Sequence, residues 1–228
     1  MQTTLENILI LYEDNHLIIV NKRVGDLVQG DKTGDIPLSE IVKKYIQIKY
    51  QKPGEVFLGV THRIDRPTSG IVIFARTSKA LERINELLRN HQIQKFYWAV
   101  VKNEPPKLAD TLIHFLRKNP KNNKSTTYST AIEGSKKAVL HYQLLKKLDH
   151  YSLLEIHLET GRHHQIRAQL AAIGCPIKGD LKYGFPRSNS DGGIHLHAKK
   201  ISFIHPVSNQ NIIITAALPE DAIWNLCE

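Results

Sequence analysis

The residues best suited to chemistry in this sequence lie in the segment His62–Gly70, which reads HRIDRPTSG. Its one carboxylate, Asp65, stands between the guanidinium groups of Arg63 and Arg66. Nearby positive charge favours an ionised carboxylate, so the pattern is typical of an acid that is kept charged for use as a nucleophile or an electrostatic group. Asp, Pro, Thr, Ser and Gly are also good turn formers, and a turn without chemical role is the competing interpretation.

Two short apolar runs flank this segment, at residues 56–60 and 71–75. Both are rich in β-branched side chains and bounded by Gly or Pro, which predicts buried strands. The polar segment therefore interrupts a sheet core. Loops held by rigid strands are common places for catalytic groups.

Further motifs follow in order along the chain: Lys95-Phe96-Tyr97, Gly161–Arg167 (GRHHQIR), Gly179–Gly184 (GDLKYG), Leu196-His197-Ala198 and Phe203–Pro206. Together with HRIDRPTSG they resemble the signature segments of the RluA family of pseudouridine synthases. The resemblance runs from about Ile8 to Pro219. Two positions depart from the family pattern: Arg23 stands where a proline is usual, and Gln169 where many members have histidine.

The resemblance implies an RNA pseudouridine synthase, an isomerase that converts uridine to pseudouridine without cofactor or metal. By the same resemblance Asp65 is the catalytic residue, Arg167 pairs with it, and Tyr97 stacks on the target base. Asp65 could attack the ribose, attack the base or abstract a sugar proton, and the sequence leaves these routes open. From the residues alone, Arg167 could equally form a helix-surface salt bridge and Tyr97 a core aromatic.

A uridine inside folded RNA must be flipped out before a protein group reaches it. The resemblance places Arg63 in the space that the flipped base leaves and Ile166 against the base. We expect Arg66 and His62, from the same segment as Asp65, to contact the substrate as well. Helical periodicity alone would make Ile166 a core residue, and Arg63 could simply contact a phosphate.

A strongly basic stretch lies between Arg117 and Lys147, with eight Lys or Arg residues against the single acid Glu133. We expect residues 116–136 to form an RNA-contacting loop, mobile in its Asn-rich first half. The lysines expected on the RNA backbone are Lys118, Lys121, Lys124, Lys136 and Lys137. The alternative is an ordinary solvated basic loop.

Bulk composition agrees with a nucleic-acid partner. The chain has 228 residues, a formal net charge of +9 and 41% hydrophobic residues, enough for a substantial core. Charge alone does not distinguish RNA from DNA. No apolar run reaches 18 residues and the N-terminus lacks a leader pattern, so we expect a cytoplasmic protein with no membrane partner. A monomer is the simplest expectation.

Metal binding and cysteine chemistry are not favoured. The residues His163, His164, His195, His197 and His205 lack a carboxylate or cysteine at a familiar ligand spacing. The two cysteines, Cys175 and Cys227, are too few for a disulfide framework and are expected to be reduced thiols.

Apolar periodicity predicts the elements that position these residues. Hairpins are expected over residues 8–20 and 139–158, and a strand over 96–101. Helices are expected over 37–50, from a Thr77-Ser78 cap through Leu88, and over 161–173. The predicted fold is α+β, a single pseudouridine-synthase-like catalytic domain over 1–228 with a mixed, largely antiparallel central sheet flanked by helices.

Many family members carry a small N-terminal RNA-binding domain, whereas this sequence begins almost directly in the catalytic part. We therefore expect the catalytic domain itself to recognise ribosomal RNA, transfer RNA or both. Two other functions compete with the isomerase: a catalytically inactive RNA-binding or ribosome-assembly protein on the same fold, and a hydrolase with Asp65 as nucleophile. No G-x-S-x-G motif accompanies Asp65 to support the hydrolase.

Overall fold

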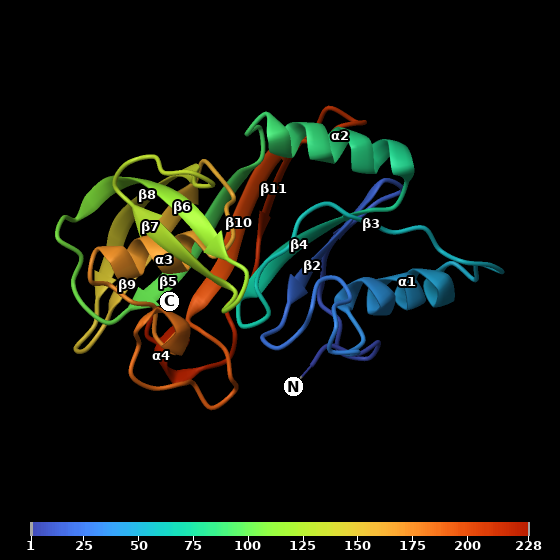
Figure 1. The fold of residues 1–228 in the computed structure, drawn as a ribbon. Helices are drawn as coiled ribbons and strands as arrows, with labels where there is room; N and C mark the ends of the chain where they lie inside the picture. The colour runs from blue at the N-terminus through green and yellow to red at the C-terminus, as the bar shows by residue number, and fades with distance from the viewer. Residues whose placement is uncertain (1, 228) are drawn as a thin grey trace. The chain divides into compact units, whose positions relative to one another are not determined.

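The computed structural model describes residues 2–227, drawn in Figure 1. These residues divide into two units. The first unit holds residues 2–93 and 198–219, and the second unit holds residues 94–197 and 220–227. The domain predicted over 1–228 thus comprises two units, and each is described by itself.

The first unit is built on a sheet whose central strands carry the apolar runs of the sequence. The predicted hairpin is present, because β1 (Ile10–Glu13) pairs antiparallel with β2 (Leu17–Lys22). On its other edge β2 pairs antiparallel with β4 (Ser69–Ala75). The remaining strands are β3 (Gly59–Val60), β11 (Asn211–Thr215) and β10 (Leu196–Ile204), the last of which belongs to this unit from Ala198 onward.

The strand predicted over residues 56–60 is much shorter than expected. Only Gly59 and Val60 pair, with the last two residues of β4. β2 already occupies one edge of β4 from Gly70 to Ala75, and β10 is a further neighbour of β4 in the sheet order. A strand has two edges, so β3 is confined to the end that β10 leaves open.

Both helices predicted for the first unit are present, as α1 (Leu38–Lys49) and α2 (Ser78–Arg89). The predicted cap of α2 is confirmed, because the Thr77 side chain accepts a hydrogen bond from the backbone N–H of Ala80. α1 buries Leu38, Val42 and Ile46 in one cluster with strand residues Ile18, Val20, Val72 and Phe74. This cluster is the core on which the polar segment before β4 is anchored.

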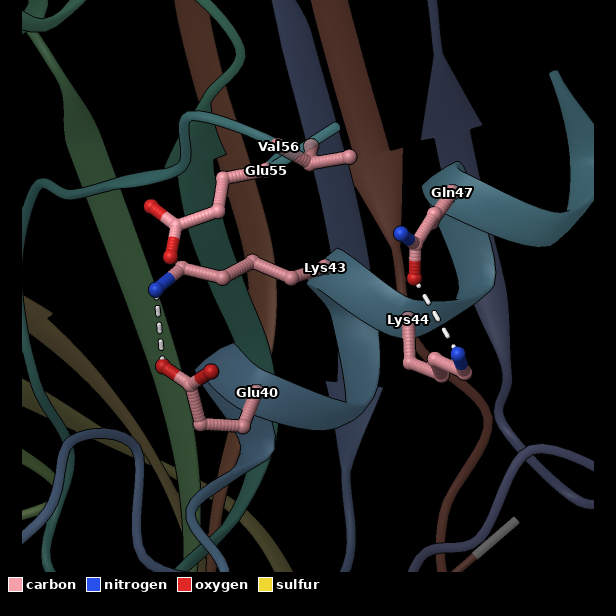
Figure 2. A pocket seen from close by; sticks show the side chains of 6 residues that line it. All are labelled: Glu40, Lys43, Lys44, Gln47, Glu55 and Val56. Carbon is pink, nitrogen blue, oxygen red and sulfur yellow. Dashed lines mark hydrogen bonds and ion pairs between the residues drawn. The ribbon is translucent and has the colours of Figure 1, made fainter. Parts of the chain in front are cut away.

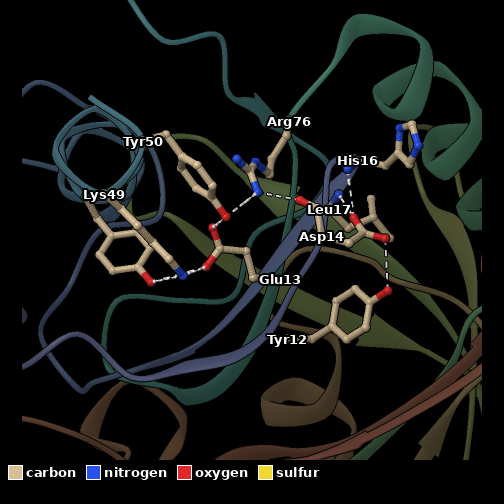
Figure 3. A network of polar contacts seen from close by, with 9 residues as sticks. Tyr12, Glu13, Asp14, His16, Leu17, Lys49, Tyr50 and Arg76 are labelled. Atoms are coloured by element: carbon tan, nitrogen blue, oxygen red, sulfur yellow. Dashed lines mark hydrogen bonds and ion pairs between the residues drawn. The ribbon is translucent and has the colours of Figure 1, made fainter. Parts of the chain in front are cut away.

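A polar network around Glu13 fastens α1 to the strands (Figure 3). The Glu13 carboxylate accepts hydrogen bonds from Lys49 at 2.7 Å, Tyr50 at 2.9 Å and Arg76 at 3.1 Å. Burial opposes the charged form, yet the hydrogen bonds from Lys49, Tyr50 and Tyr45 hold the pKa of Glu13 below its usual value. The network joins the ends of β1, α1 and β4.

The second unit contains a five-stranded antiparallel sheet in the order β5-β9-β8-β6-β7. The predicted strand over 96–101 and the hairpin over 139–158 are both confirmed. The strands are β5 (Gln94–Val101), β6 (Ala109–Asn119), β7 (Lys124–Tyr128), β8 (Lys136–Lys147) and β9 (Ser152–Leu158).

Helix α3 (Gln165–Ala172) begins four residues later than predicted. His164 adopts a left-handed backbone with φ of 52°, which interrupts the helix before that point. The Gln165 side chain then fixes the preceding loop by accepting hydrogen bonds from Thr160 Oγ1 and the Arg162 N–H. Two short helices complete the unit, the 3₁₀ helix η1 (Leu181–Tyr183) and α4 (Ala222–Asn225).

The prediction of a mobile loop in the first half of residues 116–136 is wrong. Residues 109–119 and 124–128 form the paired strands β6 and β7, with Lys118 opposite Ser125. Asn123 adopts a left-handed φ of 49°, so the Asn-rich composition makes the tight turn of a hairpin instead of a loop. The predicted fold class, α+β with a largely antiparallel sheet flanked by helices, is confirmed.

Candidate functional site

In the first unit, Asp65 opens a tight turn. The backbone N–H of Thr68 donates to the Asp65 carbonyl at 3.0 Å, with Arg66 and Pro67 at the centre of the turn. Asp65 takes the first position of this turn, where aspartate is a favoured residue. β4 begins at Ser69, so the turn joins a rigid strand within four residues of the carboxylate.

A buried lysine anchors this turn. Lys22, at the end of β2, is 1% exposed, and its ammonium donates to the backbone carbonyls of Arg23 at 2.8 Å, Asp26 at 2.9 Å and Arg66 at 3.2 Å. The Arg66 carbonyl also accepts the N–H of Gly25 at 3.0 Å. Burial lowers the pKa of Lys22 to about 7, against partial compensation by Asp26 and Asp65.

A close strand contact follows the turn. Gly70 has φ of +111°, and a Cβ there would lie 2.5 Å from the backbone N and O of Ala198 in β10. No side chain fits this approach, which explains why glycine ends the HRIDRPTSG segment. The close packing of β4 against β10 therefore fixes the end of the turn that carries Asp65.

Two residues that flank Asp65 in the sequence have partners elsewhere in the first unit. The Arg66 guanidinium pairs with Asp35 at 2.8 Å. Arg63 is exposed. His62 faces the sheet, where its Nε2 accepts the N–H of Ile73 at 3.1 Å. The segment therefore presents Arg63 to solvent and uses His62 to bind the following strand.

In the second unit, Arg167 is held by a two-point ion pair. Its Nε and Nη2 donate to the two carboxylate oxygens of Asp180 at 2.7 and 2.8 Å. Arg167 is 5% exposed and Asp180 1% exposed. A bidentate pair of this kind fixes the guanidinium plane as well as its charge. The surface salt bridge considered from the sequence is therefore excluded, because both partners are buried.

The other two second-unit candidates are also buried. Tyr97 lies in β5 opposite Ile156 of β9 and is 8% exposed. Ile166, in the first turn of α3, is 4% exposed. Burial alone agrees with a core role for either side chain as well as with a role in a base-binding site.

The predicted RNA-backbone lysines fall on two strands and one turn of the second unit. Lys118 ends β6, Lys121 lies in the turn, Lys124 begins β7, and Lys136 and Lys137 begin β8. All are exposed except Lys124, which is partly buried. Lys137 lies opposite Phe115 and Lys136 opposite Leu116 in the register with β6. The basic residues thus follow one hairpin and the strand paired with it.

The histidines have structural partners. Nε2 of His205 lies 3.0 Å from the carboxylate of Asp14, and His195 contacts Asn189 and Asp221 at 3.0 and 2.9 Å. In the described part of the chain, no three His, Cys, Asp or Glu side chains gather in a way that could hold a metal ion. Cys175 and Cys227 are buried thiols, and burial raises the pKa of each.

A surface pocket lies elsewhere in the first unit, along α1 (Figure 2). Its lining is charged and polar: Glu40, Lys43, Lys44, Gln47 and Glu55, with Val56. Lys43 pairs with Glu40 at 2.8 Å and Lys44 contacts Gln47 at 3.1 Å, so its cations have partners on the same helix. None of the predicted site residues lines it.

Three buried side chains outside the predicted site residues make long-range hydrogen bonds: Lys22, Asp180 and Tyr183. Asp180 and Tyr183 lie in the Gly179–Gly184 motif and Lys22 follows the predicted hairpin, but their partners lie 13, 58 and 44 residues away along the chain. Only an apolar neighbourhood around a charged residue could have signalled Lys22, which follows the buried run Leu17–Val20.

The sequence and fold were compared with known proteins. The family model described as RNA pseudouridylate synthase matches residues 16–172. An uncharacterized RNA pseudouridine synthase of Synechocystis is 33% identical over 213 residues, covering 92% of this chain and 65% of the relative. The ribosomal large subunit pseudouridine synthase C of Buchnera aphidicola is 32% identical, covering 93% of this chain and 67% of the relative. The chain thus spans about two thirds of the length of these relatives.

The solved structure of Human RNA Pseudouridylate Synthase Domain Containing 4 shares the fold, with a TM-score of 0.80 at 23% identity over 96% of this chain and 92% of that one. The motifs and the matching family model define a class of isomerases that act on RNA. The chain belongs to the RNA pseudouridylate synthase family. The resemblance drawn from the HRIDRPTSG and GRHHQIR segments is thereby confirmed.

Proposed function

We propose that this protein isomerises specific uridines to pseudouridine in ribosomal RNA, transfer RNA or both, as a cytoplasmic monomer, with Asp65 as the essential carboxylate. Family membership carries the proposal, together with the relative named as a ribosomal large subunit enzyme. Among residues 2–227, none of the helices combines the length and apolar composition needed to span a bilayer.

The reaction determines which groups are needed. The bond from ribose C1′ to uracil N1 breaks, the base turns, and C1′ rejoins the base at C5, which loses a proton while N1 gains one. No oxidation occurs and no water is consumed. The protein must supply a carboxylate for the reacting nucleotide, positive charge, and surfaces that keep the detached base in place.

Asp65 supplies the carboxylate in this proposal. Its turn is fixed by the Thr68 N–H, by the Lys22 ammonium and by the start of β4. A reacting group gains most when its position is set before substrate binds, since misplacement by about 1 Å can cost a hundredfold in rate. The anchoring of this turn is the observation that favours chemistry over a turn of no function.

Arg167 supplies the positive charge. Its two-point pair with Asp180 keeps the guanidinium in one orientation inside the protein. Lysine could not reproduce that geometry, because its ammonium is a single point charge on a flexible stem. Tyr97 and Ile166 provide the aromatic and aliphatic surfaces for the base, as the family pattern assigns.

Substrate entry requires the uridine to leave its stack, at a cost of about a few kcal/mol. The exposed guanidinium of Arg63, two residues before Asp65, can fill the vacated space or bind a phosphate. Arg66 and His62 contact the substrate from the same segment. The five lysines of the hairpin and of β8 follow the RNA backbone, where a basic protein gains most of its affinity.

Tritium release from RNA labelled at C5 of uridine tests the proposal. Unmodified ribosomal and transfer RNA transcripts are incubated separately with the wild-type protein and with Asp65→Ala. Release by the wild type alone is expected, and the productive transcript identifies the RNA class. Free uracil in the product would support the hydrolase. RNA binding without release from any transcript would support the inactive RNA-binding protein.

A further inference from the structure

Tyr183, in the second unit, is a buried residue whose hydroxyl has polar partners on two different segments. It is 7% exposed and packs in a cluster with Leu116, Ala138 and Ala168. Its hydroxyl accepts the backbone N–H of Ser125 at 2.8 Å. The same hydroxyl lies 3.0 Å from Nδ1 of His164, the residue before α3. One side chain therefore contacts both the β6–β7 hairpin and the start of the helix that carries Arg167.

The ring of Tyr183 also contacts two cations. Cζ of Arg167 lies 5.2 Å from the ring centroid, and Nζ of Lys124 lies 5.0 Å from it. Both distances are within the range of cation–π attraction. The two cations differ in their partners, because Arg167 forms an ion pair with Asp180, whereas no carboxylate within residues 2–227 forms an ion pair with Lys124.

A second lysine lies at the same turn. Nζ of Lys182, from η1, donates to the carbonyl of Asn123 at 3.2 Å. Lys124 and Lys182 thus place two positive charges beside the tip of the hairpin, with no acid among residues 116–128. An RNA phosphate is a ligand that neutralises such a pair. Phosphate contacts fix the position of a protein on a nucleic acid.

A separate contact ties the hairpin to the same helix. The Ser125 hydroxyl donates to the carbonyl of His163 at 2.7 Å and lies 2.9 Å from its Nδ1. His163 stacks on His164 with ring centroids 3.8 Å apart. The hairpin strand β7 therefore cannot shift at Ser125 without disturbing residues 163 and 164, directly before α3.

We propose that Lys124, supported by Lys182, binds an RNA phosphate and that Tyr183 is a positioning residue that couples this binding to the orientation of Arg167. The inference rests on the proposed function. Removal of the Tyr183 hydroxyl leaves the buried Ser125 N–H without its acceptor, and water cannot replace it at a site this enclosed. The hairpin and the start of α3 then lose the connection that runs through Tyr183, so RNA binding and the chemical step both weaken.

The test uses the full-length protein and an RNA transcript that the wild type modifies. Tyr183→Phe removes the hydroxyl and keeps the ring, Lys124→Gln removes the charge, and the double variant combines them. Tyr128→Phe is the matched control, since Tyr128 lies on the same strand with its hydroxyl near Arg117 on the exposed side. Three readouts are taken: RNA affinity against salt, single-turnover tritium release at saturating RNA, and melting temperature.

Lys124→Gln is expected to reduce the slope of log affinity against log salt by about 0.7 to 0.9, the value for one phosphate contact. Tyr183→Phe is expected to slow single turnover by about tenfold or more, as misplacement of a reacting group does. In the double variant the rate losses should be less than multiplicative, because both substitutions break one connection. Tyr128→Phe should change none of the three readouts.

Other results overturn the inference. An unchanged salt slope in Lys124→Gln would remove the phosphate contact. A single-turnover rate of Tyr183→Phe within twofold of wild type, with only a lower melting temperature, would make Tyr183 a core residue and nothing more. No release by the wild type from any RNA would instead defeat the proposed function, a result distinguishable from both.

Discussion

The turn that carries Asp65 and the helix that carries Arg167 are stabilised by different kinds of contact. At the turn the anchors act on the main chain: Lys22 donates to the Arg66 carbonyl, and Gly70 packs against the Ala198 backbone. At the helix the anchor acts on the side chain itself, through the two oxygens of Asp180. Substitution of an anchoring residue should therefore displace the backbone of the Asp65 turn in the first unit. In the second unit it should displace the charged guanidinium of Arg167.

The difference explains which residues tolerate substitution. A contact to the main chain requires space for close packing and enough hydrogen-bond donors. A glycine is therefore needed at position 70, and a long buried cation at position 22. A side-chain anchor depends on matched geometry, so arginine and a carboxylate are needed as a pair.

The largest effect is expected at the ion pair of the second unit. Asp180→Ala leaves a buried guanidinium without its carboxylate, which should lower the free energy of unfolding by about 3 to 5 kcal/mol. Arg167→Lys should destabilise the protein less than Asp180→Ala does. Its turnover should be about a hundredfold slower than that of the wild type, because the fixed guanidinium plane is lost. Asp110→Asn is the matched control, since its pair with Lys107 lies at the surface. Chemical denaturation and single-turnover kinetics measure the two quantities.

At Gly70 the steric contribution can be separated from backbone strain. Gly70→Ala brings a Cβ within 2.5 Å of the Ala198 backbone, so we expect a loss of about 3 kcal/mol or more. Gly34→Ala has a similar positive φ of +79° with no atom within 4 Å, and should cost only about 1 to 2 kcal/mol. Equal losses in urea denaturation would show that strain alone matters.

Lys22 should make stability depend on pH. Burial lowers its pKa to about 7 in the folded protein, whereas the unfolded chain keeps the proton up to about pH 10. The unfolded state therefore binds more protons between these values, and the free energy of unfolding gains up to about 1.4 kcal/mol per pH unit from this group as pH rises. The gain is lost as pH falls toward 7.

Lys22→Met should remove that pH dependence and lower stability near pH 7, because three backbone carbonyls lose their donor. Lys43→Met, at an exposed i,i+3 pair of α1, is the control for loss of a lysine. Denaturation curves at pH 7, 8 and 9 measure the slope. A slope as steep in Lys22→Met as in wild type would assign the dependence to another group.

The smallest effect is expected at the pair of Arg66 and Asp35. The side chains of Arg66 and Asp35 are 40% and 42% exposed, and such pairs contribute only about 0 to 1 kcal/mol to the free energy of unfolding. Asp35→Asn should leave stability within about 0.5 kcal/mol of wild type. A larger loss in thermal unfolding would show that this pair, and not Lys22, anchors the turn.

Local patterns predicted much of this fold. Alternation and apolar runs identified the β1–β2 and β8–β9 hairpins, and Thr77 identified the start of α2. The β6–β7 hairpin was missed because its Asn, Pro and Lys residues are typical of loops, while pairing of β6 with β8 keeps it in the sheet. The length of the strand predicted over 56–60 was overestimated, because the sequence does not show which edges of β4 are already paired with other strands.

The candidate site divides in the same way. Motif residues such as Asp65 and Arg167 could be identified from the sequence, since their types and spacing are distinctive. Their supports could not, because the partners of Lys22, Asp180 and Tyr183 are set by packing between distant segments. The Asp35 partner of Arg66 could not be predicted for the same reason, as Asp35 comes from a separate loop.

The central claim is that Asp65 performs chemistry and does not serve only to bind RNA or shape the turn. Single-turnover tritium release and RNA affinity of Asp65→Asn, compared with Asp35→Asn, test it most directly. We expect Asp65→Asn to bind RNA within about threefold of wild type and to lose at least about a thousandfold in rate, as loss of a covalent or charge-stabilising group does. A rate within tenfold of wild type at saturating RNA would contradict the claim.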